Sequence, residues 1–354
     1  MRCSEHAPLV LLLQALDHLA KEEHSLQIVA PPLWCAAEHA AGLSAILLGE
    51  HQNEGGVMTT TWTAATLREG LVFGEGPRWH KGRLYYSDFY RHGVFSINAD
   101  GSDERLEAEV PAQPSGLGWL PDGSLLVVSM TDHKVLRIES DGTQHLHADL
   151  SEYCGYWAND MVVAANGTAY VGNFGFDLDL FLEEHGIEGV LTPPGPPTTN
   201  LCVLDPGGAL IQVIDDMAFP NGSVITPDGK TLIVAETMTM RLSAFDIADD
   251  GSLSKRRIFA QLELVPADGI CLDANNEVWV ANALAPQAVR VAEGGEITGM
   301  LETSQTCFAC ALGGDDRQTL YVMTAPTSTA AIVSTLHEGR IEYAHVDTPG
   351  AGIP

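Results

Sequence analysis

A short motif rich in small residues recurs six times between residues 73 and 324, each time followed by an apolar run, a turn and a second apolar run. The aligned positions are separated by 40, 44, 62, 47 and 40 residues. They are occupied by Gly76, Gly116, Asp160, Gly222, Gly269 and Ala309. Asp-Gly and Asn-Gly turns between short Val, Ile, Leu and Tyr runs are typical of hairpins. Six repeats of about four strands at this period predict an all-β protein, a six-bladed β-propeller.

The repeat also sets the expected domain boundaries. A ring of blades must close on itself, so we expect a strand from about 62–72 to pair with strands near 330–346. The separation of 62 residues contains an insertion at roughly 177–200. Residues 1–57 lack the strand–turn pattern and predict a short helical or poorly ordered N-terminal extension, either an accessory cap or a peripheral segment. The propeller is predicted over 58–354.

The residues just before the aligned positions are unusual for strands that line a channel. They are Glu75, Ser115, Asn159, Asn221, Asp268 and Phe308. Four of the six carry hard oxygen donors, and no Lys or Arg occupies this ring. Because a buried carboxylate is costly unless it is paired or bound to metal, the pattern predicts one divalent cation held by Glu75, Asn159, Asn221 and Asp268. Oxygen ligands favour Ca²⁺, Mg²⁺ or Mn²⁺ over Zn²⁺.

A simpler interpretation exists for each residue of this ring taken alone. Asn-Gly, Asp-Gly and Asn-Asp pairs are common where side chains cap strand ends or form Asx-turns. Their shared register across the repeats is what favours a site.

Four segments resemble motifs of one known family, in the same order along the chain. They are GEGPRW, WAND, PNGSVITPDGKTLIVAE and ADGICLDANNEVWVA, within about 66–346. They resemble the gluconolactonase/regucalcin (senescence-marker-protein) family of metal-dependent lactonases. The resemblance implies a six-bladed propeller that hydrolyses sugar lactones with one divalent cation in its channel.

The same resemblance assigns roles to individual residues. Glu75, Asn221 and Asp268 correspond to metal ligands, and Asp268 also to the proton donor or acceptor. Asn159 and Asp177 correspond to substrate contacts. The sugar lactonases carry an Arg where this chain has Trp157, so an indole ring with one N–H donor replaces a guanidinium with several. We expect Trp157, Asn173 and Asp177 to shape substrate specificity.

The predicted activity is therefore metal-dependent hydrolysis of a lactone, with a sugar lactone favoured. The cation polarises the carbonyl, and Asp268 acts as the general base. Two alternatives keep the fold. One is a calcium- or ligand-binding propeller without hydrolase activity, and the other is arylesterase or strictosidine-synthase-like chemistry.

Composition limits the partners. With 18 Lys and Arg against 47 Asp and Glu, the formal net charge is −29. This balance argues against nucleic acid and anionic membranes as partners. The family resemblance implies a small-molecule lactone as the partner. Seven Cys occur, and the one C-x-x-C spacing, Cys307 to Cys310, lies inside an apolar run without a second Cys pair. This pattern, with no apolar run of spanning length, favours a cytoplasmic protein. The sequence does not specify the oligomeric state.

Overall fold

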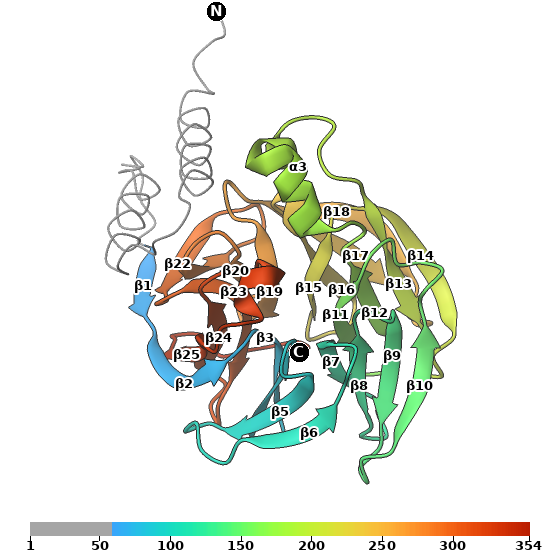
Figure 1. Cartoon of the computed structure of the whole chain (residues 1–354), viewed down its shortest axis with the longest axis horizontal. Helices are drawn as coiled ribbons and strands as arrows, with labels where there is room; N and C mark the ends of the chain where they lie inside the picture. The colour runs from blue at the N-terminus through green and yellow to red at the C-terminus, as the bar shows by residue number, and fades with distance from the viewer. Residues whose placement is uncertain (1–58) are drawn as a thin grey trace, which may run out of the picture. The chain divides into compact units, whose positions relative to one another are not determined.

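The computed structural model describes residues 59–354, and these residues fold into six sheets that form the blades of a β-propeller (Figure 1). The predicted extension 1–57 lies outside the described residues. The first blade consists of β3 (Gly74–His80), β4 (Arg83–Asp88), β5 (Gly93–Asn98) and β6 (Arg105–Glu109). The second consists of β7 (Pro114–Trp119), β8 (Leu125–Ser129), β9 (Lys134–Ile138) and β10 (Gln144–Asp149). The third consists of β11 (Ala158–Val163), β12 (Ala169–Asn173), β13 (Thr199–Leu204) and β14 (Leu210–Met217).

The remaining three blades include the strands that close the ring. The fourth consists of β15 (Pro220–Ile225), β16 (Thr231–Glu236), β17 (Arg241–Ile247) and β18 (Leu253–Gln261). The fifth consists of β19 (Ala267–Leu272), β20 (Val278–Asn282), β21 (Gln287–Val291), β22 (Ile297–Glu302) and β1 (Thr60–Thr63). The sixth consists of β23 (Thr306–Gly313), β24 (Thr319–Ala325), β25 (Gly339–His345) and β2 (Ala65–Leu71).

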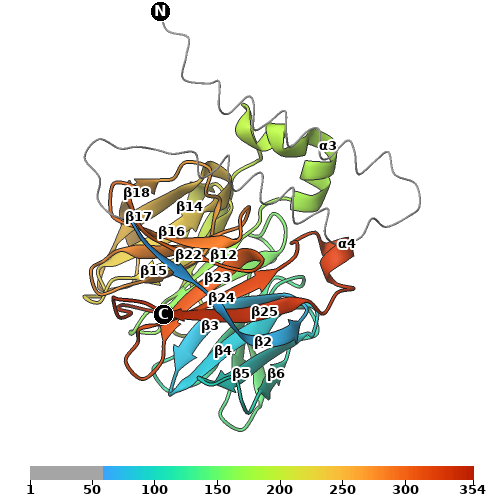
Figure 2. The ribbon, with the colours of Figure 1, turned by 90° about the vertical axis from the view of Figure 1, so that its left-hand side faces the viewer.

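The predicted closure is confirmed. Strand β2 pairs antiparallel with β25, and Figure 2 shows the two side by side. The innermost strand of the sixth blade, β23, packs against β3 of the first. The sequence reasoning did not predict β1, which pairs in parallel with β22 at the outer edge of the fifth blade.

The core lies mainly between neighbouring blades. Val224 and Leu242 of the fourth blade, for example, share one apolar cluster with Ile270 and Val289 of the fifth. The inner strands are covered on both faces, which is why their sequences read as nearly continuous apolar runs rather than alternating ones.

The aligned glycines are required where inner strands of adjacent blades approach each other. A Cβ atom at Gly116 would lie 2.2 Å from the Met161 nitrogen, and one at Gly222 would lie 2.5 Å from the Ile270 nitrogen. Any side chain there would push the blades apart, so the repeat of small residues is a packing requirement of the ring.

Short helices and a C-terminal tail complete the described chain. The insertion contains helix α3 (Leu178–Leu191), which is interrupted at Gly186. A 3-10 turn, η1 (Thr237–Thr239), follows β16, and α4 (Ala330–Val333) lies between β24 and β25. No helix in residues 59–354 is long and apolar enough to span a membrane.

The tail after β25 returns to the inner strands. Gly350 bridges Asp273, and Ile353 bridges Ile225, so the tail runs across the ends of β19 and β15. Figure 1 shows the C-terminus near the middle of the ring of blades.

Candidate active site

The same irregularity interrupts the inner strand of every blade. Pairing with the second strand shifts register between Glu75 and Arg78, Pro114 and Leu117, Ala158 and Met161, Pro220 and Ser223, Ala267 and Ile270, and Cys307 and Ala309. A β-bulge bends its strand and re-aims the side chains beside it, and bulges are over-represented next to active sites. Here the six bulges fall on the ring of residues that the sequence singled out.

Five of these bulges, all except that of the second blade, contribute a residue to one cavity of about 350 Å³. It is lined by Glu75, Asn159, Asn221 and Asp268 from four different blades, together with Trp157 and Asp177. The structure therefore brings six of the seven residues considered for the site to one place. Asn173 does not line the cavity.

Glu75 is half-buried and lines the cavity. Its Oε2 atom accepts a hydrogen bond from the backbone N–H of Gly76 at 3.0 Å. Burial raises the pKa of Glu75 well above its usual value, and the nearby negative charges of Asp268 and Asp160 raise it further. The Gly76 hydrogen bond and Arg78 lower this pKa only in part.

Asp268 behaves in the same way. Burial raises the pKa of Asp268 well above its usual value, and Asp160 adds to the rise. Hydrogen bonds from the Asn221 side chain and the Gly269 backbone oppose the shift without reversing it. Asn221 also donates through Nδ2 to Thr237 Oγ1 at 3.3 Å, which fixes the amide beside the carboxylate.

Arg78 is the nearest cationic side chain to these carboxylates, and it is already paired. Its guanidinium donates to Asp160 Oδ1 at 2.8 Å, to the Met161 carbonyl at 2.8 Å and to the Leu117 carbonyl at 3.1 Å. It thereby ties three blades together, and Asp160 acts as its structural partner. In residues 59–354, no Lys, Arg or His forms an ion pair with Glu75 or Asp268.

Asn159 supplies an unused polar atom. Its Oδ1 accepts a weak hydrogen bond from Ser115 Oγ at 3.4 Å, while its buried Nδ2 has no partner. An amide can be turned to present either its oxygen or its nitrogen at such a place. Buried polar groups are normally satisfied, so the unpaired atom makes Asn159 a candidate contact for a bound ligand.

The four side chains fit a hard divalent cation. Two carboxylates without a cationic partner and two amides offer the oxygen ligands that Ca²⁺, Mg²⁺ and Mn²⁺ prefer. The part of the chain that the structure describes contains no cluster of three or more His, Cys, Asp and Glu side chains placed to bind a metal ion. The four proposed ligands include only two residues of these types, Glu75 and Asp268, because the other two are asparagines.

The remaining predicted residues have different surroundings. Trp157 lies partly buried in the cavity wall, with its ring stacked on Tyr156 at a centroid distance of 4.9 Å. Asp177 accepts from Tyr156 Oη at 2.9 Å and from the Leu180 N–H at 3.1 Å, so it caps the start of α3. Asn173 is fully buried, donating to the Asn200 carbonyl and accepting from Thr199, so its amide supports the loop rather than facing a ligand.

Sequence reasoning missed a second set of lining residues. Each immediately follows the second strand of its blade: Phe89, Met130, Phe174, Thr237 and Ala283. The sequence could have indicated them, because they occupy equivalent positions in the repeats. They end the segments YYSDF, VVSM, VGNF, VAET and VANA. Their varied chemistry hides the equivalence until the ends of the second strands are known.

Comparison with known proteins agrees with the propeller and its repeats. Residues 73–326 match the family model described as SMP-30/Gluconolactonase/LRE-like region. The pentonolactonase XacC of Haloferax volcanii is 28% identical over 261 residues, which cover 71% of this chain and 81% of that protein. The lactonase drp35 of Staphylococcus epidermidis is 25% identical over 228 residues, covering 60% of this chain and 62% of that protein.

A solved structure shares the fold. Regucalcin from Agrobacterium tumefaciens, described as a calcium-binding protein, superposes with a TM-score of 0.68 at 20% identity. The superposition covers 84% of this chain and 99% of that one. The family match extends over most of the chain and includes the inner strands of all six blades, which confirms that this protein belongs to the SMP-30/gluconolactonase/LRE-like family.

Proposed function

We propose that this protein hydrolyses a lactone to the corresponding hydroxy acid, with one divalent cation held by Glu75, Asn159, Asn221 and Asp268. The observation that carries the proposal is the pair of carboxylates, Glu75 and Asp268, enclosed at one cavity without a cationic side chain to neutralise them. The relatives named pentonolactonase and lactonase support the choice of reaction.

The chemistry follows from the groups around the cavity. A divalent cation bound to this set would supply Lewis-acid polarisation of the lactone carbonyl. Asp268 accepts a proton from the attacking water as the oxygen of that water bonds to the carbonyl carbon. The bond from the acyl carbon to the ring oxygen then breaks, and the proton passes to that oxygen, which gives the hydroxy acid.

Two neighbouring groups position the reactants. Asn221, held between Asp268 and Thr237, keeps the carboxylate of Asp268 in one orientation. Asn159 presents an unpaired amide atom to the cavity, where it can hydrogen bond to the substrate or the attacking water. The sequence predicts a sugar lactone as the substrate, and the side chains that line the cavity provide independent evidence on the substrate class. A cytoplasmic location stays a prediction.

The direct test measures acid release from a panel of lactones with a pH indicator, before and after EDTA treatment. We expect EDTA to abolish turnover, and Mn²⁺, Mg²⁺ or Ca²⁺ to restore it. Asp268→Asn should lower kcat/KM by at least about a thousandfold, because a general base contributes roughly 10²–10⁴ and a cation ligand is lost with it.

Asp273→Asn provides a matched control. Asp273 is a buried carboxylate near the other end of the same strand, and burial raises its pKa too, but it does not line the cavity. An Asn there keeps an acceptor for the N–H groups of Asn275 and Glu277. Equal losses in the two variants would contradict the assignment of Asp268. Cation binding without turnover of any lactone would instead favour a non-hydrolytic binding protein.

A further inference from the structure

The walls of the cavity are built from two groups of aromatic rings. The first group joins Phe73 to Phe89 and to Phe308, at centroid distances of 5.2 and 4.9 Å. The second group runs through Tyr156, Trp157, Phe174 and Phe219, at successive centroid distances of 4.9, 6.0 and 4.6 Å. Members of both groups line the same cavity as Glu75 and Asp268, so a bound molecule meets carboxylates and amides at one place and ring faces around it.

The polar side chains elsewhere in the lining are largely engaged by the protein itself. Both carboxylate oxygens of Asp177 accept hydrogen bonds, from Tyr156 and Leu180. Asp179 accepts from the N–H of Ala330 at 3.0 Å, and Thr237 donates to the Ala267 carbonyl at 2.7 Å. Within the described chain the lining includes no Lys, Arg, His or Gln. The side-chain donors of Tyr90, Trp157 and Ser328 stay without a hydrogen bond in residues 59–354, so one N–H and two hydroxyls are left for the non-reacting part of a substrate.

This distribution favours an apolar substituent over a polyhydroxylated one. Each hydroxyl that enters such a wall exchanges hydrogen bonds with water for none, which weakens binding by roughly fivefold or more. Each methylene that becomes buried strengthens binding by roughly fourfold. Aromatic faces can stack on sugar rings, but the hydroxyls at the edge of a stacked sugar still need partners, and this wall supplies few.

We propose that the lactone carries an aliphatic or aromatic substituent, which lies between the two aromatic groups while the ester faces Glu75, Asn159, Asn221 and Asp268. This inference rests on the proposed function and names its substrate class. Trp157 is a specificity-determining residue in this arrangement, because it links Tyr156 to Phe174 within the second aromatic group.

A series of six-membered lactones isolates the substituent from the reacting ring. The full chain, saturated with Mn²⁺ or Ca²⁺, is assayed on δ-valerolactone, δ-octalactone, δ-decalactone and δ-gluconolactone. Each kcat/KM is divided by the rate constant for hydroxide-catalysed hydrolysis of the same lactone. We expect a rise of at least about tenfold from δ-valerolactone to δ-decalactone, and δ-gluconolactone about thirtyfold or more below δ-decalactone.

Binding of lactams, measured by calorimetry, separates failure of this inference from failure of the proposed function. The δ-lactam with a pentyl substituent, whose amide resists hydrolysis, should bind at least about tenfold more tightly than unsubstituted δ-valerolactam. Turnover that favours δ-gluconolactone, or that ignores chain length, overturns the inference and leaves lactone hydrolysis standing. Preferential binding of the pentyl lactam without turnover of any lactone overturns the proposed function and leaves the apolar site.

Paired substitutions test the role of Trp157. Trp157→Gln should reduce the preference for δ-decalactone over δ-valerolactone by at least about fivefold. Trp119→Gln is the control, since Trp119 stacks on His80 at 3.9 Å and does not line the cavity. Thermal unfolding curves verify that both variants fold, and the lactone series on the native chain tests the inference independently of them. An equal change in both variants, or none in Trp157→Gln, contradicts the role of Trp157.

Discussion

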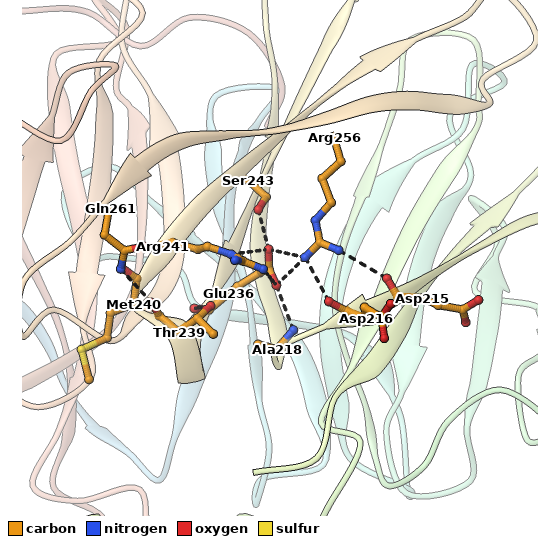
Figure 3. A network of polar contacts seen from close by, with 10 residues as sticks. All are labelled: Asp215, Asp216, Ala218, Glu236, Thr239, Met240, Arg241, Ser243, Arg256 and Gln261. Carbon is orange, nitrogen blue, oxygen red and sulfur yellow. Dashed lines mark hydrogen bonds and ion pairs between the residues drawn. The ribbon is translucent and has the colours of Figure 1, made fainter. Parts of the chain in front are cut away.

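Carboxylates in two regions of the propeller differ in their partners. Cationic groups surround Glu236, but none among the described residues pairs with Glu75 or Asp268. Arg241 donates to Glu236 twice at 3.0 Å, and Arg256 contacts both of its oxygens at 2.8 Å. Figure 3 shows Ser243 and the Ala218 N–H completing this network. Burial alone would raise the pKa of Glu236, but these hydrogen bonds hold it below its usual value.

The two regions differ in what they do for folding. The Glu236 carboxylate is satisfied by the chain itself, so its charge supports the native state. Glu75 and Asp268 have raised pKa values because burial and nearby negative charges outweigh the groups that lower them. A protein keeps such an arrangement where a function requires it, and perturbed carboxylates in a cavity are candidates for functional groups.

Removing the carboxylate of Glu236 should have the largest effect on stability. Glu236→Gln leaves Arg241 and Arg256 without their shared anion, and breaking a buried ion pair on one side costs roughly 3–5 kcal/mol. We expect a loss near 3 kcal/mol, because both arginines keep some access to water. Urea unfolding measures it, with Glu293→Gln at an exposed turn as the control. A loss below about 1 kcal/mol would contradict the structural role of Glu236.

Adding a cation should stabilise the other region by a slightly smaller amount. A ligand at a hundred times its dissociation constant adds about 2.7 kcal/mol to the free energy of unfolding. Thermal unfolding in CaCl2 or MnCl2 should show the gain in the native chain and in Asp273→Asn. Glu75→Gln should lose most of it. An equal gain in Glu75→Gln would show that the cation binds elsewhere.

Without a cation, Glu75→Gln should stabilise the protein at high pH. The folded-state pKa of Glu75 is raised, so the native state binds the extra proton and loses stability as pH rises from the unfolded pKa to the folded one. The variant should therefore be more stable than the native chain at pH 8 and nearly unchanged at pH 4.

Glu236 should show the opposite dependence on pH. Its folded-state pKa is lowered, so its contribution is present above the unfolded pKa and is lost as pH falls through the folded one. Urea unfolding in EDTA from pH 4 to pH 8 compares both residues. If the stability changes caused by Glu75→Gln and Glu236→Gln varied with pH in the same direction, the proposed difference between the two carboxylates would be wrong.

Asp177 is the intermediate case and should give the smallest effect. It lines the cavity, but its partners are two neutral donors, Tyr156 and the Leu180 N–H. Asp177→Asn keeps a capping oxygen, so we expect less than about 1 kcal/mol of lost stability and less than about a fivefold change in kcat/KM. A much larger fall in kcat/KM with stability unchanged would mean that Asp177 contacts the substrate.

The repeat made the fold and the convergence of the four donors predictable. Its aligned positions mark the close contacts between blades, and Gly116 and Gly222 show why a side chain is excluded there. Once the ring closes, residues one position earlier, such as Asn221 and Asp268, must face one channel. The closure of β2 on β25 followed from the same requirement.

The other residues that line the cavity could not be predicted from the repeat. Ser328 and Ala330 come from the long connection between β24 and β25, which contains α4 and whose length the repeat does not specify. Asn173 looked available in the sequence, but its partner Asn200 lies beyond the insertion, and only the folded chain shows that its amide is engaged. Asp177 caps α3 in the long connection between β12 and β13, whose conformation the repeat does not specify either.

The C-terminal tail has a kinetic consequence. Its last residues, Ile353 and Pro354, line a second cavity together with inner-strand residues of the first three blades, including Trp79, Leu117 and Val162, at the end of the strands opposite to the carboxylates. Because the tail crosses this end, we expect substrate entry and product release in the proposed lactonase to share the opening at the other end. Competitive product inhibition by the hydroxy acid, visible in progress curves, is then the expected behaviour.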